Sequence, residues 1–202
     1  PGEQVVYGLM MVNRTYYEQE VKQRVSKKRF EHSLRTADFA EKLAEIYGEE
    51  GEKAWIAGML HDVGRELSYD ALKRITAVKY SITPWEETNP ILVHGKAAAV
   101  IAEEELGIED TAILEAIAGH VTGQPGMSTL SKIIFIADYL EPGREYLQRN
   151  SGASLIGEAD LDELLLFVLK KILDHRRRKG KMIVEPARRL FDELTHNKFR
   201  LK

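Results

Sequence analysis

Apolar residues recur at helical spacing along almost the whole chain, and alternating strand patterns are nearly absent. Between Phe30 and Tyr47 they fall at i, i+4 and i+7 spacing, which places them on one face of a helix. Further helices are expected over residues 52–60, after Pro90, from Asp110 to His120, from Ser128 to Leu140, from Asp160 and after Pro186. We therefore expect an all-α fold, a compact multi-helix bundle.

Start and stop signals support several of these helices. Thr83-Pro84-Trp85-Glu86 has the pattern of a capping box with proline at the first helical position. Ser128 can cap the helix that follows the breaker Gly123-Gln124-Pro125-Gly126, and Pro142-Gly143 ends it. There is no internal repeat, low-complexity tract or linker. We therefore expect one domain over residues 14–202, preceded by an N-terminal arm over residues 1–13.

Composition removes several classes of function. The chain of 202 residues has no cysteine, which excludes disulfides, thiolate metal sites and a cysteine nucleophile. Its formal net charge of −3 gives no reason to expect binding to nucleic acid or to a membrane. No segment approaches the roughly 18 consecutive apolar residues of a membrane span. We expect a cytoplasmic protein whose metal chemistry, if any, uses histidine and carboxylate ligands.

Two aspartates lie in apolar surroundings. His61-Asp62 ends the apolar helix 54–60, where unpaired polar groups are costly. Asp138 lies inside the run 133–140, whose other residues are apolar. An ionised carboxylate in such a place must be paired, hydrogen-bonded or bound to a metal. A structural salt bridge to an arginine is the alternative for Asp138.

Four of the six histidines share these inner helix faces. His94 opens an alanine-rich helix, and His120 follows Ile113 and Ile117 on one face. His32 lies early in the first long helix, where a core or surface role is the alternative to a ligand. His175 and His196 sit among polar residues and are expected to be exposed.

Together these residues form a nitrogen and oxygen ligand set. Such a set suits Fe, Mn, Co or Zn rather than Ca or Mg alone. The number of ligands exceeds what one catalytic metal needs when it keeps coordination positions open for water and substrate, which indicates two ions. The expected metal ligands are His32, His61, Asp62, His94, His120 and Asp138.

The order His32, His61-Asp62, Asp138 resembles the signature of the HD-domain metal-dependent phosphohydrolases. The intervening His94 and His120 resemble the subset with a dinuclear centre. Three stretches closely resemble the bacterial HD-domain hydrolases that cleave diadenosine tetraphosphate symmetrically: RFEHSLR (29–35), NPILVHGKAAA (89–99) and AGHVTGQPGMSTLSKIIFIADYLEPGR (118–144). The similarity spans roughly residues 15–200.

The chain departs from this family pattern at two places. The family usually has Ala-Lys after its His-Asp-Tyr, whereas this chain has Val63-Gly64-Arg65. The family commonly has two threonines after the histidine that matches His120, whereas this chain has Val121-Thr122. Arg65 keeps the positive charge and can grip phosphate through two nitrogens. The departures therefore concern substrate positioning rather than the ligands.

The resemblance implies a single HD-domain bundle with a divalent metal. It implies that His32, His61, Asp62 and Asp138 hold the principal ion and that Asp62 bridges to a second. In the alternative, one iron is bound, and His94 and His120 contact substrate phosphate. Iron is the first choice of metal, with Mn, Co or Zn as alternatives.

The implied reaction is hydrolysis of diadenosine tetraphosphate to two ADP by metal-activated water. A bound divalent metal lowers the pKa of its water toward about 7. His61 and Asp62 are the expected catalytic residues. The expected substrate contacts are Arg29, Arg65, His94, Lys96, His120 and Arg144. The expected partner is a dinucleoside polyphosphate or an ADP-like nucleotide, and a homodimer is plausible from the family.

Two other readings stay open. One is another HD phosphohydrolase, acting on nucleoside monophosphates, guanosine alarmones or cyclic nucleotides. The other is a nucleotide-binding regulator that no longer turns over. The basic tract Arg176–Lys181 has a plain structural interpretation, because cations at the end of a helix complement its dipole.

Overall fold

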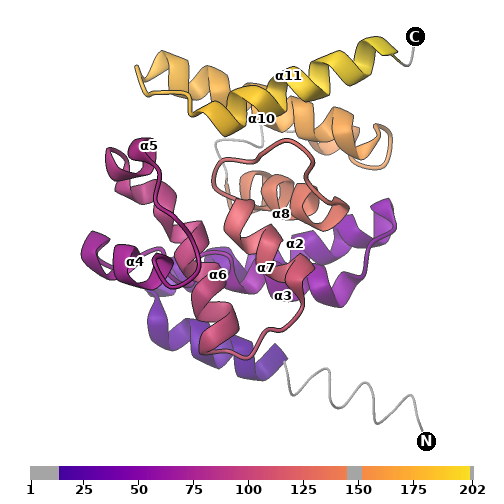
Figure 1. Cartoon of the computed structure of the whole chain (residues 1–202). Helices are drawn as coiled ribbons and strands as arrows, with labels where there is room; N and C mark the ends of the chain where they lie inside the picture. Colours follow the sequence, from indigo (N-terminus) through magenta and orange to yellow (C-terminus); the bar gives the residue numbers. More distant parts are fainter. Residues whose placement is uncertain (1–13, 145–151, 201–202) are drawn as a thin grey trace, which may run out of the picture.

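A computed structural model describes residues 14–144 and 152–200 of the chain. Every regular element in these two ranges is helical, which confirms the all-α prediction (Figure 1). The arm predicted over residues 1–13 lies outside the described residues. In the part of the chain that is described, no helix is long and apolar enough to span a membrane.

The helices follow the expected order along the sequence. A helix over residues 14–24 comes first. It is followed by α2 (Lys27–Tyr47), α3 (Gly51–Leu60), α4 (Tyr69–Thr76), α5 (Pro84–Glu87), a 3-10 turn (Pro90–Val93), α6 (His94–Glu104), α7 (Thr111–Gly119), α8 (Thr129–Leu140), a second 3-10 turn (Gly152–Leu155), α10 (Leu161–Arg178) and α11 (Glu185–Arg200). The sequence patterns did not predict the 14–24 helix or α4. Only Leu72 and Thr76 of α4 are buried, so this helix contributes few core residues that could mark it in the sequence.

Side-chain caps fix several helix starts at the predicted residues. The Ser128 hydroxyl accepts a hydrogen bond from the backbone N–H of Ser131, and Asp160 accepts one from Glu163. Thr83 and Glu86 form the predicted capping box. Ser26 caps α2, which therefore begins at Lys27 instead of near Phe30. The earlier start adds a turn of helix ahead of His32.

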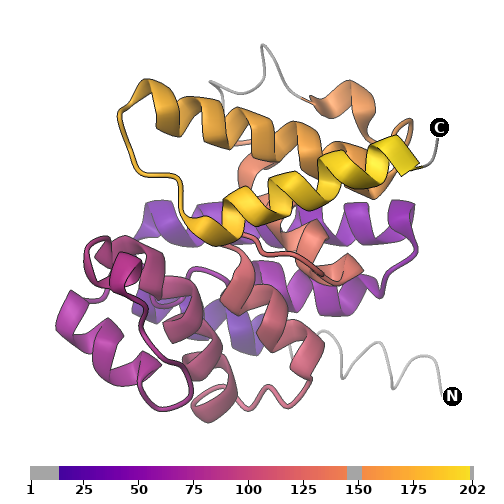
Figure 2. The same ribbon diagram turned by 45° about the horizontal axis from the view of Figure 1, so that its top comes forward.

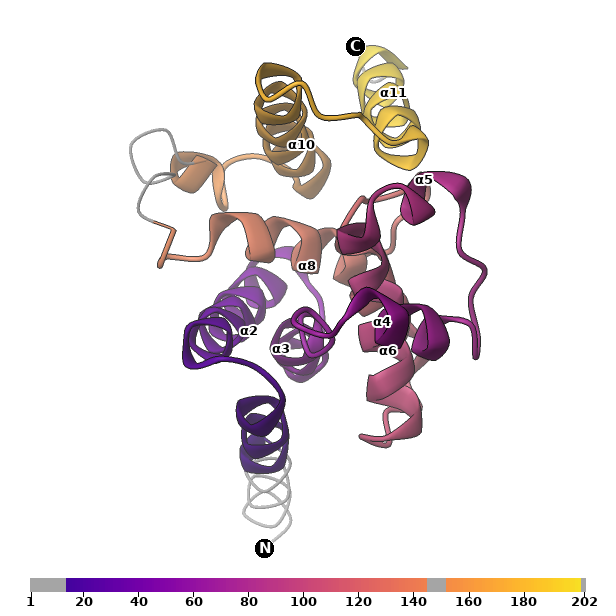
Figure 3. The same cartoon turned by 90° about the vertical axis from the view of Figure 1, so that its left-hand side faces the viewer.

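The helices stack around α8. Figure 3 shows α2 and α3 on one side of α8, with α10 and α11 on the other. Figure 2 shows α10 and α11 running side by side as an outer layer, while α4, α5 and α6 form a second group that packs on α7 through α6. The largest fully buried side chains include Trp55, Ile133, Ile136, Leu165 and Leu169. The core therefore runs from α3 through α8 to α10.

The contact between α2 and α3 is unusually close. A Cβ added to Gly58 on α3 would lie 2.8 Å from Ala37 Cα and 3.2 Å from the Thr36 carbonyl carbon. The buried stripe of α2 consists of small residues with one histidine and one leucine: His32, Ser33, Thr36, Ala37, Ala40, Leu43 and Ala44. Phe30, Leu34 and Tyr47, which the spacing placed on the inner face, are only partly buried. That expectation was partly wrong, because a backbone this close leaves room only for small side chains.

We expect Gly58→Ala to destabilise the protein by about 1–3 kcal/mol, because the new methyl group would push against backbone atoms that cannot move aside. Gly119→Ala is the matched control, since a Cβ there meets nothing within 4 Å and Gly119 also lies in a helix. The control should be neutral or stabilising, because alanine favours the helix over glycine. Thermal unfolding of the two variants checks the difference. Equal unfolding temperatures would contradict the close packing.

Candidate metal centre

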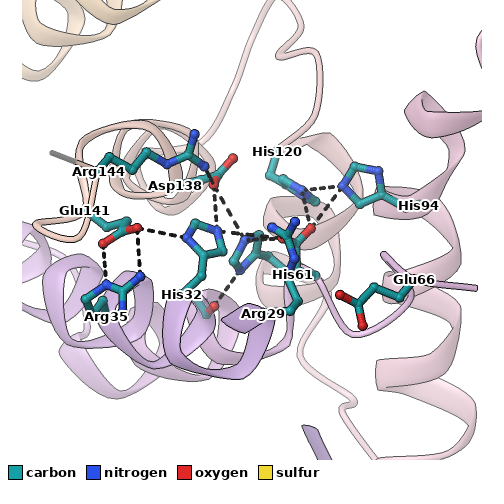
Figure 4. A network of polar contacts seen from close by, with 12 residues as sticks. Arg29, His32, Arg35, His61, Glu66, His94, His120, Asp138, Glu141 and Arg144 are labelled. Carbon is teal, nitrogen blue, oxygen red and sulfur yellow. Dashed lines mark hydrogen bonds and ion pairs between the residues drawn. The ribbon is translucent and has the colours of Figure 1, made fainter. Parts of the chain in front are cut away.

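Six predicted ligands converge from five helices (Figure 4). His32 lies in the second turn of α2, and His61 and Asp62 directly follow α3. His94 is the first residue of α6, His120 directly follows α7, and Asp138 lies in the last turn of α8. All are buried except Asp138, whose side chain is 26% exposed. Helix ends therefore deliver every one of these side chains to one place.

The first group of atoms surrounds one oxygen from each aspartate. The Nε2 atom of His32 lies 3.1 Å from Oδ1 of Asp138 and 3.7 Å from Oδ2 of Asp62. The Nε2 atom of His61 lies 3.4 Å from Oδ2 of Asp62 and 3.7 Å from Oδ1 of Asp138. Two imidazoles and two carboxylates thus share one small volume.

The second group of atoms surrounds the other oxygen of Asp62. Its Oδ1 atom lies 3.1 Å from Nε2 of His94 and 3.7 Å from Nε2 of His120. These two Nε2 atoms are 3.1 Å apart. The two oxygens of Asp62 therefore face two different pairs of histidines.

Hydrogen bonds on the far side of each ring set the tautomer. Nδ1 of His61 donates to the carbonyl oxygen of Gly58 at 2.6 Å, and Nδ1 of His120 donates to that of Ile117 at 2.7 Å. The Nδ1 atom of His94 donates to the carbonyl oxygen of Ile91. Nδ1 of His32 donates to Oε1 of Glu141 at 3.1 Å. Because these oxygens can only accept, a neutral ring keeps its lone pair on the inward Nε2.

This arrangement fits a divalent cation. The buried Nε2 atoms of His32 and His61 have no hydrogen-bond partner. The inward lone pairs of His94 and His120 face each other, which is unfavourable without a proton or a cation between them. Imidazole nitrogen and carboxylate oxygen are the donors that Zn, Fe, Mn and Co accept. The residues present therefore suit such an ion.

The electrostatics of the site favour a cation as well. Burial raises the pKa of Asp62, but the imidazoles of His61, His120 and His94 beside it outweigh burial and hold this pKa well below its usual value. The pKa of Asp138 is lowered too, because the neighbouring His32 and His61 imidazoles and the Arg144 guanidinium outweigh the effect of burial. Burial lowers the pKa of His120. Ionised carboxylates and a neutral imidazole form a natural cation site.

A cleft of about 680 Å³ opens onto these ligands. His61 lies behind its surface, whereas the other five ligands line it. The guanidinium of Arg29 donates to Oδ2 of Asp62 at 2.7 Å, and that of Arg144 donates to Oδ1 of Asp138 at 2.7 Å. The cations that line the cleft are Lys28, Arg29, Arg35, Arg65 and Arg144. The cleft is thus suited to an anionic ligand.

Arg65 is placed differently from Arg29 and Arg144. It is half-buried, and its guanidinium has no hydrogen-bond or ion-pair partner among the residues that the structure describes. Burial lowers the pKa of Arg65, although Asp62 partly opposes this shift. An uncompensated, partly desolvated guanidinium in a cleft is well suited to an oxyanion.

Lys96 does not line the cleft. Its ammonium donates at 2.8 Å to the carboxylate of Glu86 and at 3.0 Å to the carbonyl oxygen of Ser81. Because Glu86 is buried, it holds Lys96 as a structural partner. The sequence could not show this, since Lys96 follows His94 closely in the chain but points to a different neighbour. We leave Lys96 out of the proposed substrate contacts.

Three charged residues of the cleft were not predicted from the sequence: Lys28, Arg35 and Glu141. On α2, Lys28 directly precedes the RFEHSLR segment and Arg35 ends it. Each lies about one helical turn from His32, and this spacing was the available signal. Glu141 follows Asp138 by three residues, at the end of α8. No pattern distinguished it from an ordinary acidic residue at a helix end.

The bundle gathers histidine nitrogens and carboxylates at the floor of a cleft that is lined by cations. This arrangement is typical of metal-dependent enzymes that act on phosphate-bearing ligands. Comparison with known families makes the class specific. The model of the HD domain matches residues 29–143, which include all six ligands. The chain belongs to the HD-domain family of metal-dependent phosphohydrolases.

Individual relatives agree with this assignment. The chain is 32% identical to the symmetrical bis(5'-nucleosyl)-tetraphosphatase of Bacillus subtilis. The match covers 81% of this chain and 87% of that enzyme. It is 36% identical to the enzyme of that name from Halalkalibacterium halodurans, over 67% of this chain and 72% of that one. A crystal structure from Clostridium acetobutylicum, described as a predicted HD superfamily hydrolase involved in NAD metabolism, superposes with a TM-score of 0.85 at 34% identity. The match covers 91% of this chain and 97% of that one.

Proposed function

We propose that this chain hydrolyses diadenosine tetraphosphate symmetrically to two ADP. One observation carries the proposal: the six-residue ligand set lies on the floor of a cleft lined by five cations, in a chain similar over most of its length to symmetrical tetraphosphatases. Water adds to one of the two inner phosphorus atoms, and the bond from that phosphorus to the central bridging oxygen breaks. Both products are then nucleoside diphosphates.

We propose that the centre holds two ions. His32, His61 and Asp138 with Oδ2 of Asp62 would hold one, and His94 and His120 with Oδ1 of Asp62 would hold the other. The separate orientation of the two Asp62 oxygens supports two ions over the single-ion alternative. Iron is the proposed physiological metal, with Mn, Co and Zn as substitutes, because the mixed donor set accepts each of them.

The chain's own residues supply position and charge. When bound, a divalent ion supplies a water of lowered pKa, near about 7, and a Lewis acid for phosphoryl oxygens. Asp62 and His61, the proposed catalytic residues, would hold the ion and so set where its water stands relative to the phosphate. ADP is a good leaving group, so no strong general acid is required. Catalysis then depends on orientation and on neutralising the negative charge that builds up.

The arginines of the cleft suit the polyphosphate chain. Arg29 and Arg144 already reach the aspartate oxygens that face the histidines, so a phosphate bound there would lie between these guanidiniums. Arg65 and Lys28 line the same cleft and add positive charge to it. Four cations and a metal centre can balance a tetra-anionic substrate although the whole chain carries a formal net charge of −3.

Product analysis tests the proposed reaction. Protein loaded anaerobically with Fe²⁺ or with Mn²⁺ is given diadenosine tetraphosphate, and the nucleotides are separated by anion-exchange chromatography. Two ADP per substrate are expected. ATP plus AMP would exclude symmetrical cleavage. Hydrolysis only of a nucleoside monophosphate, a guanosine alarmone or a cyclic nucleotide would favour another HD activity, and no hydrolysis of any of them would favour a regulator.

We expect Arg65→Ala to lower kcat/KM for diadenosine tetraphosphate by about 10- to 100-fold, because a hydrogen bond to a charged group contributes about 1.5–3 kcal/mol. The folded protein should lose little stability, since the guanidinium has no partner to leave behind among the described residues. Steady-state kinetics and thermal unfolding check the two parts of this prediction.

Lys96→Ala is the contrasting variant. It leaves the carboxylate of Glu86 buried without its cation, so its cost should appear as a lower unfolding temperature rather than as a specific kinetic defect. If Arg65→Ala keeps the kinetic constants of the unmodified protein, Arg65 does not contact the substrate.

The homodimer, the cytoplasmic location and the lack of nucleic-acid binding stay predictions.

A further inference from the structure

His32 differs from the other histidines of the centre in what holds its ring. Rings of His61, His94 and His120 each donate from Nδ1 to the backbone carbonyl three residues earlier. His32 instead donates to a carboxylate, Oε1 of Glu141, at 3.1 Å. Figure 4 shows Glu141 on the far side of the His32 ring from Asp138. Among these four histidines, only His32 has a carboxylate, that of Glu141, on the side of its ring away from the proposed ion.

Glu141 is itself firmly held. Its side chain is 2% exposed and lies between α2 and the end of α8. Oε2 accepts hydrogen bonds from Nε of Arg35 at 2.7 Å and from the backbone N–H of Gly143 at 2.5 Å. Oε1 also accepts from Nη2 of Arg35 at 3.3 Å. These donors satisfy both oxygens, so the carboxylate cannot turn away from His32 without losing them.

Glu141 also stabilises the turn that carries Arg144. The backbone N–H of Arg144 donates to the backbone carbonyl of Glu141 at 3.1 Å. A Cβ on Gly143 would collide with the Arg35 guanidinium, so the turn lies directly against the group that holds Glu141. The turn that places Arg144 beside Asp138 is thus held by the residue that orients His32, through the Glu141 backbone carbonyl and through its carboxylate, which accepts from the Gly143 N–H.

A carboxylate behind a ligating imidazole has two effects. It fixes the ring orientation, and it makes Nε2 a stronger donor, because the negative charge polarises the Nδ1–H bond toward it. A backbone carbonyl provides the first effect but less of the second. The ion beside His32 would therefore gain affinity that the ion beside His94 and His120 does not.

We propose that Glu141, held by Arg35, is a positioning residue that orients and strengthens His32 as a metal ligand and so raises the affinity of one of the two metal positions. The inference rests on the proposed metal centre, but not on the identity of the substrate. Removing the charge of Glu141 while keeping its shape should weaken one metal-binding event and leave the other unchanged.

Titration of metal-free protein with Co²⁺ tests this role. Visible absorption of Co²⁺ and calorimetry give the dissociation constants without any substrate. Glu141→Gln should weaken one binding event by about 10- to 100-fold, the usual cost of losing an outer partner of a metal ligand. Glu141→Asp keeps the charge on a shorter side chain, so it should retain more affinity than Glu141→Gln and provides a second variant if glutamine at this position prevents folding.

Glu86→Gln is the matched control. Glu86 is equally buried, and it accepts hydrogen bonds from a cation, Lys96, and from the backbone N–H of Thr83, but it contacts no histidine of the centre. It should lower the unfolding temperature of the metal-free protein and leave both Co²⁺ dissociation constants unchanged. If Glu86→Gln weakens Co²⁺ binding as much as Glu141→Gln does, the effect is general destabilisation and the inference is wrong.

The outcomes separate this inference from the proposed centre. Unmodified protein that binds no Co²⁺ contradicts the centre itself. Unmodified protein that binds Co²⁺, together with Glu141→Gln protein that binds it equally well, contradicts only the role of Glu141. Weakening of one event by Glu141→Gln, with partial recovery in Glu141→Asp, supports the inference.

Discussion

Asp62→Asn is expected to remove hydrolytic activity. Losing a residue that hydrogen-bonds to a metal ligand costs roughly 10- to 100-fold, and losing Asp62 should lower kcat/KM by much more than that. Asp62 alone among the six ligands presents one oxygen to each pair of histidines. Asparagine has nearly the same shape, but it carries no charge and places an amide nitrogen where one oxygen faces histidine. Both metal positions should therefore weaken together.

The measurement is Mn²⁺ or Co²⁺ stoichiometry by elemental analysis, together with steady-state kinetics. Asp38→Asn is the control, because Asp38 is an exposed carboxylate on α2 that accepts a hydrogen bond from Trp55 Nε1 at 3.1 Å, away from the cleft. It should keep activity and metal content. Full activity in Asp62→Asn protein would overturn the proposed catalytic site. Loss of one ion only would show that Asp62 does not serve both positions.

Removing metal by chelation is expected to abolish activity and to lower the unfolding temperature. An ion that binds the folded chain only stabilises it, by about 2.7 kcal/mol when its free concentration is 100 times its dissociation constant. Without the ion, the closely spaced Nε2 atoms of His94 and His120 and the carboxylates must be compensated by protons and arginines. Calorimetry of chelated and reloaded protein measures the stability change.

Reloading with different ions tests the ligand chemistry. Fe²⁺, Mn²⁺, Co²⁺ or Zn²⁺ should restore activity, whereas Ca²⁺ should not, because the proposed sites hold four imidazoles between them and Ca²⁺ takes oxygen ligands. Elemental analysis must show the chelated protein to be free of metal. Undiminished hydrolysis by such protein would exclude the proposed mechanism.

The sequence determined features that depend on neighbours a few residues apart. Ser128 and Asp160 cap their helices as predicted, because a side-chain oxygen reaches backbone N–H groups only two or three residues ahead. Periodicity placed His120 on an inner face for the same local reason, and the apolar run around Asp138 placed that carboxylate inside. The six candidate ligands could be named because metal-competent residues in apolar surroundings are rare and costly.

Only the tertiary structure decided how these faces meet. Gly58 packs against the α2 backbone, so α2 buries mostly small side chains there, and Phe30 is only partly buried. Lys96 pairs with Glu86 although it is two residues from His94, and Glu141 reaches His32 across 109 positions of sequence. Spacing along one helix carries no information about such distant pairs, because they depend on how whole helices pack. Packing therefore turned a predicted ligand set into a centre with two distinct sides.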